Sequence, residues 1–399
     1  MDILEQILQG IHWFIFGFFA FNVGYLGLLS IAGNFRSKPN HPSSENKLRF
    51  AVLIPGYMED EVIVEVAKEA LKQKYPSAFY EVIVIADSFA PSTLQELQQL
   101  PIRVIEVFFD NSTKSKSINK ALEQIDDRNF EAVVILDADN LMAVDFLCCV
   151  NKAFQAGYKV VQGHRTAKNR NTPFAILDAA NEEINNHIFR KGQRALGMSS
   201  SLIGSAMAFE LDYFREIMSS IDDVAGEDKE MQLKILKDGV KIEYLENAHV
   251  LDEKVQNARV FSKQRTRWIA TQFYYLKPTY LLDGLRQLLF KGNIDFFNKI
   301  IQTFILPRIL LLGSLTFFTI LTLIIQTRLS YWYWGGLLIS TGLILLIAVP
   351  GSFFNKDLIK ALINIPKAFL YMLKALFSIK GADKKFIHTP HSASNELKS

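Results

Sequence analysis

Residues 132–140 read AVVILDADN, and this stretch decides the fold class. Ala132–Leu136 is a short apolar run rich in β-branched residues, which predicts a strand buried on both faces. The strand ends at Asp137, and a second carboxylate follows at Asp139. We expect the chain to bend after Leu136, so that both carboxylates serve one site.

Similar buried strands precede this stretch. Runs at Phe50–Pro55, Glu81–Ala86 and Arg103–Phe108 predict three further strands, and residues 60–74 and 116–125 have helical patterns. Apolar strands that alternate with helices predict an α/β domain with a mostly parallel sheet covered on both faces. Ligands of such sheets bind beyond the carboxyl ends of the strands.

Polar side chains follow these strand ends. Tyr57 and Glu59 follow the first strand, Asp87 ends the second, and Asp137 and Asp139 follow the fourth. Acidic strand ends on one edge of a sheet indicate a site for a nucleotide and a divalent metal, and Mg²⁺ or Mn²⁺ suits carboxylate oxygens. A solvated turn or a helix cap is the alternative for the acidic pair, and ordinary packing is the alternative for Tyr57.

Composition excludes several classes of protein. The chain has 399 residues, of which 44 are basic and 41 acidic, and its mean hydropathy is +0.13. The large apolar fraction of 49% excludes a disordered chain, and the nearly balanced charge argues against nucleic acid as a partner. Cys148 and Cys149 are adjacent and cannot form an ordinary structural bridge, so a disulfide scaffold is excluded and a reducing compartment is expected.

Long apolar segments predict that the protein is an integral membrane protein. The segments are Ile11–Ala32, Ile309–Ile325 and Trp332–Val349, and buried core helices, which rarely stay uncharged for so long, are the alternative. Basic residues follow the first and last segments. The positive-inside rule therefore predicts that residues 33–300 and the C-terminus lie in the cytoplasm and the N-terminus outside, as in a bacterial inner membrane.

Amphipathic segments flank the last two spans. Residues 355–380 and 280–297 predict helices that lie in the cytoplasmic interface of the bilayer, with packing on the soluble domain as the alternative. Arg308 follows Pro307 at the start of the second apolar segment. We expect it at the cytoplasmic boundary, with its side chain extended toward lipid phosphates.

Two downstream motifs complete a recognisable series. Glu227-Asp228 opens a helical stretch, and Gln264 to Trp268 reads QRTRW. The chain resembles, over about residues 50–270 and the flanking membrane helices, the processive-type membrane glycosyltransferases of glycosyltransferase family 2, which include cellulose, chitin and hyaluronan synthases. The shared series is a strand-end aspartate, a D-x-D, an E-D pair and a Q-x-x-R-W, present in order as Asp87, Asp137/Asp139, Glu227/Asp228 and Gln264/Arg267/Trp268.

The resemblance implies a GT-A (Rossmann-like) fold, a UDP-sugar donor, a Mg²⁺ or Mn²⁺ cofactor and inversion at the anomeric carbon. Asp139, with Asp137 nearby, would hold the metal that stabilises the leaving diphosphate. Arg267 would bind the diphosphate through its planar fork. Asp228 would be the general base that takes the proton of the acceptor hydroxyl. Tyr57 and Glu59 lie where the family binds the nucleoside, although Met58 departs from the asparagine that relatives often carry.

Other residues acquire roles from the same resemblance. Trp268 would stack on the acceptor sugar, and Gln264 and Glu227 would orient the acceptor or the base. Gly204-Ser205 resembles a small-residue segment near the acceptor, with tight packing as the alternative. Lys114 would approach the nucleotide, with a solvated lysine as the alternative. For the Glu227-Asp228 pair, the alternative is an acidic helix N-terminus. For residues 265–268, the alternative is a membrane-surface anchor.

The C-terminal tail carries one further candidate. Phe386 and Thr389 match the spacing of the gating loop of cellulose synthases, and His391 replaces its lysine. Closure of such a loop over the nucleotide would exclude water. A free tail is the alternative.

Three functions are compatible with these patterns. The leading hypothesis is a synthase that extends a β-linked polysaccharide; a non-processive transferase that adds one sugar to a lipid or lipid-linked acceptor is the second, and a non-catalytic sugar-nucleotide binder is the third. Three helices from one chain can hardly enclose a polymer, so a channel would need a homo-oligomer or accessory subunits.

The expected organisation is 1–35 transmembrane helix, 36–49 linker, 50–275 GT-A domain, 276–300 interfacial region, 301–350 two transmembrane helices, 351–382 interfacial helix and 383–399 tail.

Overall fold

A computed structural model describes most of the chain. The described residues are 3–35, 41, 45–126, 129–221, 226–325 and 330–377. The predicted gating residues Phe386, Thr389 and His391 lie outside them, so the gate stays a prediction.

An eight-stranded mixed sheet forms the centre of the soluble part, with the strand order β3-β2-β1-β4-β7-β6-β8-β5. β1 to β4 are parallel to one another, and β6 is parallel to β8, but β7 runs antiparallel to β4 and β6, and β5 antiparallel to β8. The sheet is therefore mixed: the predicted parallel arrangement holds for the first four strands and for the pair β6–β8. The strands are β1 Phe50–Tyr57, β2 Tyr80–Asp87, β3 Arg103–Val107, β4 Ala132–Ile135, β5 Leu141–Met142, β6 Val160–Ala167, β7 Met207–Glu210 and β8 Ile242–Asp252.

Helices cover both faces of this sheet because side chains of each buried strand alternate between the two faces. Val52 and Ile54 of β1 pack in one cluster with α2, α3 and α5, whereas Ala51 and Leu53 pack in the other with α4, α8 and α9. The helices are α2 Ile63–Ala70, α3 Pro91–Gln98, α4 Lys114–Leu122, α5 Phe146–Gln155, α8 Leu211–Met218 and α9 Glu227–Lys237, with a 3₁₀ turn at Ser77–Phe79.

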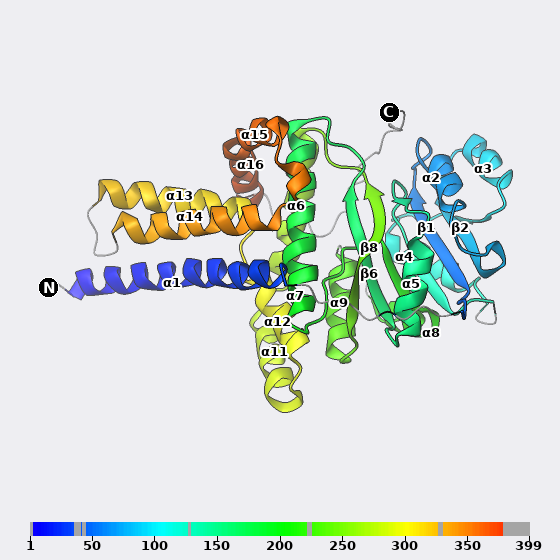
Figure 1. Ribbon diagram of the computed structural model, residues 1–399, viewed down its shortest axis with the longest axis horizontal. Helices are drawn as coiled ribbons and strands as arrows, with labels where there is room; N and C mark the ends of the chain where they lie inside the picture. Colours follow the sequence, from blue (N-terminus) through cyan, green and yellow to red (C-terminus); the bar gives the residue numbers. More distant parts are fainter. Residues whose placement is uncertain are drawn as a thin grey trace.

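The remaining helices lie on one side of the sheet (Figure 1). α1, α13 and α14 run side by side away from the sheet, and α6 lies across their inner ends. α11 and α12 lie on one side of these inner ends, and α15 and α16 on the other. These elements are α1 Ile3–Ala32, α6 Pro173–Asn185 with a π-helical continuation Asn186–Gly192, α7 Gln193–Ala195, α10 Ala258–Tyr274, α11 Pro278–Lys291, α12 Ile294–Thr303, α13 Arg308–Ile324, α14 Tyr331–Ala348, a 3₁₀ turn Gly351–Phe353, α15 Lys356–Leu362 and α16 Ile365–Phe377.

Two of these helices, α1 and α14, are long and apolar enough to cross a membrane. α12 and α13 pass the same test only as a pair bent by 55°, which would make a third span among the described residues. α1, α13 and α14 pack on one another through the buried side chains of Phe19, Leu315 and Trp334. Side chains therefore fill the space between the three helices.

The inner end of α1 is tied to the soluble part at the π-helical segment. A Cβ atom added to Gly192 would lie 2.2 Å from the carbonyl oxygen of Leu29, so only glycine permits this approach. His187 Nε2 lies 2.8 Å from the carbonyl oxygen of Ser30. These contacts hold the apolar helices at a defined place relative to the sheet.

Both predicted interfacial helices are interrupted. Gly292 adopts φ +63° and ends α11, so residues 280–297 span two helices instead of one. Asn364 precedes α16, and Pro366 lies in its first turn, where a missing N–H costs nothing. Each helix pair keeps exposed apolar residues, among them Leu289 and Phe290 of α11 and Leu370 of α16.

Candidate active site

The predicted polar strand ends meet at one large cavity. Tyr57, Glu59 and Asp87 line it together with the loop after β4, and its volume is about 1230 Å³. The backbone is strained at the rim, because Met58 and Ser88, which directly follow β1 and β2, adopt φ values of 54° and 59°. Strain of this kind in non-glycine residues clusters at functional sites.

Three carboxylates form a candidate metal site in this cavity. Asp137, Asp139 and Asp252 each offer an oxygen within 4.8 Å of the others. The bend predicted after β4 brings the first two together, and Asp252 is contributed by the last position of β8. Asn140 Nδ2 donates to Asp139 and to Asp252, each at 3.1 Å, and thereby fixes their relative position. An all-oxygen carboxylate set suits Mg²⁺ or Mn²⁺.

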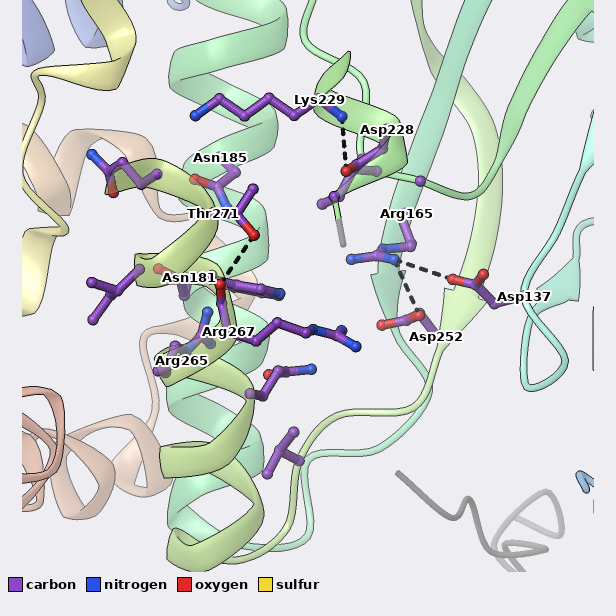
Figure 2. Close-up of a pocket in the computed structure, with 18 of the residues that line it drawn as sticks. Asp137, Arg165, Asn181, Asn185, Asp228, Lys229, Asp252, Arg265, Arg267 and Thr271 are labelled. Carbon is purple, nitrogen blue, oxygen red and sulfur yellow. Dashed lines mark hydrogen bonds and ion pairs between the residues drawn. The ribbon is translucent and has the colours of Figure 1, made fainter. Parts of the chain in front are cut away.

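Two cations lie against the same carboxylates. Lys114, at the first position of α4, forms an ion pair with Asp137 and donates to the carbonyl oxygen of Gly204 at 2.7 Å. Arg165 Nη1 lies 3.7 Å from Asp137 and 3.5 Å from Asp252, as Figure 2 shows. Burial alone would raise the pKa of Asp137, but Lys114 and Arg165 hold it below its usual value.

A buried ionic network continues from this site to α6. Glu182 accepts from Arg165 at 3.1 Å and from Arg190 at 3.4 Å, and Lys254 Nζ lies 3.7 Å away. Lys254 also pairs with Asp252 at 2.6 Å. Burial opposes ionisation of Glu182, but the three cations lower its pKa below the ordinary range. The network fixes the metal-site carboxylates to the helix that crosses the inner ends of the apolar helices.

The acidic pair lies on the same side of the cavity as the aspartate cluster (Figure 2). Gly226 precedes α9 with φ +98°, and a Cβ atom there would lie 2.6 Å from Thr271 Cγ2 of α10, so glycine is required where α9 meets α10. Asp228 lines the cavity beside Gly204: a Cβ atom at Gly204 would lie 3.6 Å from Asp228 Oδ2. Burial and the neighbouring Asp228 raise the pKa of Glu227.

α10 presents the Q-x-x-R-W residues on one face. Gln264, Arg267 and Trp268 are spaced by three and four residues, which share a helix face, and all line the cavity. Figure 2 shows the Arg267 side chain extended from α10 toward Arg165 and Asp252. Arg265 is turned away, forms an ion pair with Asp178, and lies 4.1 Å from the centre of the Trp268 ring.

Some predicted residues have other surroundings than expected. Ser205 is fully buried, and its Oγ accepts from Arg165 at 3.3 Å, so it supports the arginine from behind instead of facing the cavity. Arg308 does not extend outward to the phosphates of the surrounding bilayer, because it donates to Asn181 and Asn185 of α6 and lines the cavity.

Sequence reasoning missed Asp252, Arg165 and Glu182. The strand pattern KIEYLENAHV covers residues 241–250 and stops two residues before Asp252. An aspartate at the end of an apolar strand was the same signal that identified Asp87 and Asp137.

Comparison with known proteins agrees with this geometry. The model of the family described as glycosyltransferase like family 2 matches residues 48–271, more than half of the chain. The chain belongs to this family. The matched residues contain β1 to β8 and most of α10, so the family match includes every strand-end carboxylate and the α10 face.

Individual family 2 relatives are distant. The probable glycosyltransferase YdaM of Bacillus subtilis is 24% identical over 278 residues, which are 64% of this chain and 64% of that protein. The poly(ribitol-phosphate) β-N-acetylglucosaminyltransferase TarS of Staphylococcus aureus is 28% identical over 97 residues, 23% of this chain and 16% of that one. The chain thus spans less than two thirds of the length of either relative.

A solved structure has the same fold along nearly the whole chain. The mannosyltransferase PcManGT of Pyrobaculum calidifontis, in complex with GDP-Man and Mn²⁺, aligns with a TM-score of 0.59 and covers 95% of this chain and 99% of its own. The sequences are 16% identical, so the likeness is one of fold. It includes the apolar helices as well as the GT-A-like sheet.

Proposed function

We propose that this chain is an inverting membrane glycosyltransferase that moves a sugar from a UDP-sugar to a hydroxyl group of a membrane-bound acceptor. The observation that carries the proposal is the cavity in which the three-aspartate cluster, Arg267 and Asp228 face one another from β4, β8, α9 and α10. Next to the part of the cavity that suits a metal-bound diphosphate, Asp228 offers a single carboxylate base.

The residues have the following proposed tasks. Asp137, Asp139 and Asp252 would hold Mg²⁺ or Mn²⁺, which neutralises charge on the leaving diphosphate. Arg267 and Lys114 bind the diphosphate oxygens from opposite sides. The acceptor oxygen attacks the anomeric carbon, the bond to the diphosphate oxygen breaks with its electron pair, and the proton goes to Asp228. A single displacement with one base inverts the anomeric configuration.

Donor recognition follows the predicted sites. Tyr57, Glu59 and Asp87 line the end of the cavity at β1 and β2, where the nucleoside would lie. Gln264, Trp268 and Glu227 line the acceptor side around Asp228. The solved neighbour carries GDP-Man and Mn²⁺, which supports a nucleotide-sugar with a divalent cation and adds guanosine donors to the candidates.

The acceptor is better explained by a lipid or lipid-linked molecule than by a growing polysaccharide. Phe19, Leu315 and Trp334 fill the centre of the bundle of α1, α13 and α14. A polymer would need a path that these described helices do not leave between them. The cavity, in contrast, reaches Leu26 of α1 and Ile309 of α13 and is therefore accessible to a lipid at the inner ends of the helices. Polysaccharide extension stays the second candidate.

We also propose that the catalytic domain, about residues 50–275, lies in the cytoplasm. The exposed apolar side chains of α11 and α16 near the inner ends of α1, α13 and α14 support contact with a bilayer at that level. The paired helices would hold the cavity mouth against the lipid surface.

Product length tests the proposal. Purified protein is incubated with radiolabelled UDP-sugars and a membrane lipid extract, and the products are separated by organic extraction and by gel filtration. Addition of one sugar to an extractable product is expected. The matched control is Asp228→Asn, which should give no product. A labelled polymer excluded from the organic phase would favour the synthase, and no transfer from any donor would contradict the proposal.

A further inference from the structure

The cavity has an end that the proposed chemistry does not use. Beyond Asp228 and Arg267 it continues to the inner ends of α1 and α13, where its wall is apolar. The apolar residues of this end are Leu26, Leu177, Phe189, Ile305, Leu306, Pro307, Ile309 and Met372. The cavity therefore joins the reacting groups to the level at which the apolar helices begin.

A cation lies at this junction. Arg308 is the first residue of α13, and its Nη2 donates to the carbonyl oxygen of Asn181 at 3.2 Å and to Asn185 Oδ1 at 2.8 Å. Both partners are neutral. Arg308 Nη1 is buried and has no hydrogen-bond partner within the described residues. The guanidinium is thus held in place by amides while one of its donor groups and its charge stay available.

A second basic side chain lines the same cavity. Lys299 of α12 has no hydrogen bond or ion pair with any residue in the described ranges. Lys229 of α9 also lines the cavity, and its ammonium lies 4.7 Å from the centre of the Tyr275 ring. Both ammonium groups are partly buried, and cations withdrawn from water are costly unless an anion pairs with them. The acceptor side of the cavity is therefore suited to a ligand with negative charge.

We propose that Arg308, together with Lys299, binds a phosphate group of a lipid acceptor. The proposal rests on the transferase function above. The hydroxyl-bearing head of the lipid would reach Asp228, its phosphate would lie at Arg308, and its hydrocarbon chain would lie against Leu26 and Ile309. A phosphate matches the planar guanidinium fork, and it is the anionic group found where headgroups meet hydrocarbon. The phosphate is a point of attachment and does not react.

Binding of a simple lipid phosphate tests this inference without any donor. The probe is monododecyl phosphate, added to the full chain in dodecyl maltoside, a detergent with the same hydrocarbon chain and a neutral head. We expect it to bind at least about tenfold more tightly than inorganic phosphate, because the apolar wall adds to the ionic contact. Arg308→Gln and Lys299→Gln should each weaken binding about tenfold, the weaker end of the range for hydrogen bonds to charged groups. Arg286→Gln, on the exposed face of α11, is the matched control and should bind as the wild type does.

Several outcomes would overturn the inference. Unchanged binding in Arg308→Gln would refute it, and so would equal affinities for monododecyl phosphate and inorganic phosphate, which would indicate a site for free phosphate. If Arg308→Gln fails to fold, unchanged binding in Lys299→Gln has the same meaning. Donor turnover is measured separately, so a chain that transfers no sugar but binds the probe through Arg308 would refute the proposed function alone.

Discussion

Replacement of Asp252 by asparagine is the sharpest test of the metal site, because this residue came from the structure alone. Asparagine keeps the shape of the side chain and can still accept from Asn140, but it removes one of the three clustered carboxylates. Loss of a partner in the second coordination shell already costs about 10–100-fold in metal affinity, so a direct ligand should cost at least as much.

The fold should tolerate the change at moderate cost. Lys254 and Arg165 both lose a carboxylate at Asp252, but each keeps Glu182, at 3.7 Å and 3.1 Å. The loss is thus closer to one hydrogen bond to a charged group, about 1.5–3 kcal/mol, than to the complete loss of a buried ion pair. Thermal unfolding should show a lower but still cooperative transition.

The assay is a Mn²⁺ titration of nucleoside diphosphate release. The half-saturating Mn²⁺ concentration of Asp252→Asn should rise at least about tenfold, and saturating Mn²⁺ should restore much of the rate. Asp212→Asn, an exposed aspartate of α8, is the control and should titrate as the wild type does. A half-saturating concentration within about twofold of wild type would refute Asp252 as a metal ligand.

Three further changes test other parts of the site. Asp228→Asn should keep nucleotide binding and lower transfer at least about a hundredfold, measured as turnover at saturating donor; loss of less than tenfold would contradict its role as base. Glu182→Gln leaves Arg165, Lys254 and Arg190 without their shared carboxylate and should lower the free energy of unfolding by about 3–5 kcal/mol at pH 7. The pKa of Glu182 is lowered from 4.5, so its contribution to the free energy of unfolding is complete above pH 4.5 and is lost as the pH falls further. The difference in unfolding free energy between wild type and variant should therefore shrink in acid. A pH-independent difference would contradict this account. Truncation after Gly381 should abolish transfer in a folded, membrane-bound protein if the tail is a gate, whereas full activity would leave it a free tail.

Individual strands and helices could be predicted because they depend on residues that are close together in the sequence. The apolar run Ala132–Leu136 is a strand whose end carries the acidic pair, and the helix expected after Asp228 begins at Glu227. The face formed by Gln264, Arg267 and Trp268 follows from helical spacing alone. In each case neighbouring side chains determine both the element and the direction of its polar residues.

The order of the later strands could not be predicted, because it depends on contacts between distant residues. β7 runs antiparallel between β4 and β6, and this placement lets β8 bring Asp252 beside Asp139, 113 positions earlier in the sequence. In the sequence, Arg165 and Glu182 look like ordinary charged surface residues. Only the tertiary structure buries them together, and no local pattern distinguishes a buried ion pair from a solvated one.

The interruption of residues 280–297 was also missed for a physical reason. Residues 280–297 have continuous amphipathic spacing, but Gly292 adopts a left-handed conformation that ends α11 and starts a new direction. Arg308 was expected to reach lipid because it begins an apolar segment. Asn181 and Asn185 of α6 bind it first, and their presence there depends on the packing of α6 across α13.

The central claim is that the aspartate cluster supports metal-dependent cleavage of a nucleotide-sugar. The most direct measurement is nucleoside diphosphate release by the purified full chain from a panel of UDP- and GDP-sugars, with Mn²⁺ or with EDTA, in the wild type and in Asp139→Asn. The account predicts release from at least one donor with Mn²⁺, none above background in EDTA, and none in Asp139→Asn. Release that is equal in EDTA, or unchanged in Asp139→Asn, would contradict it.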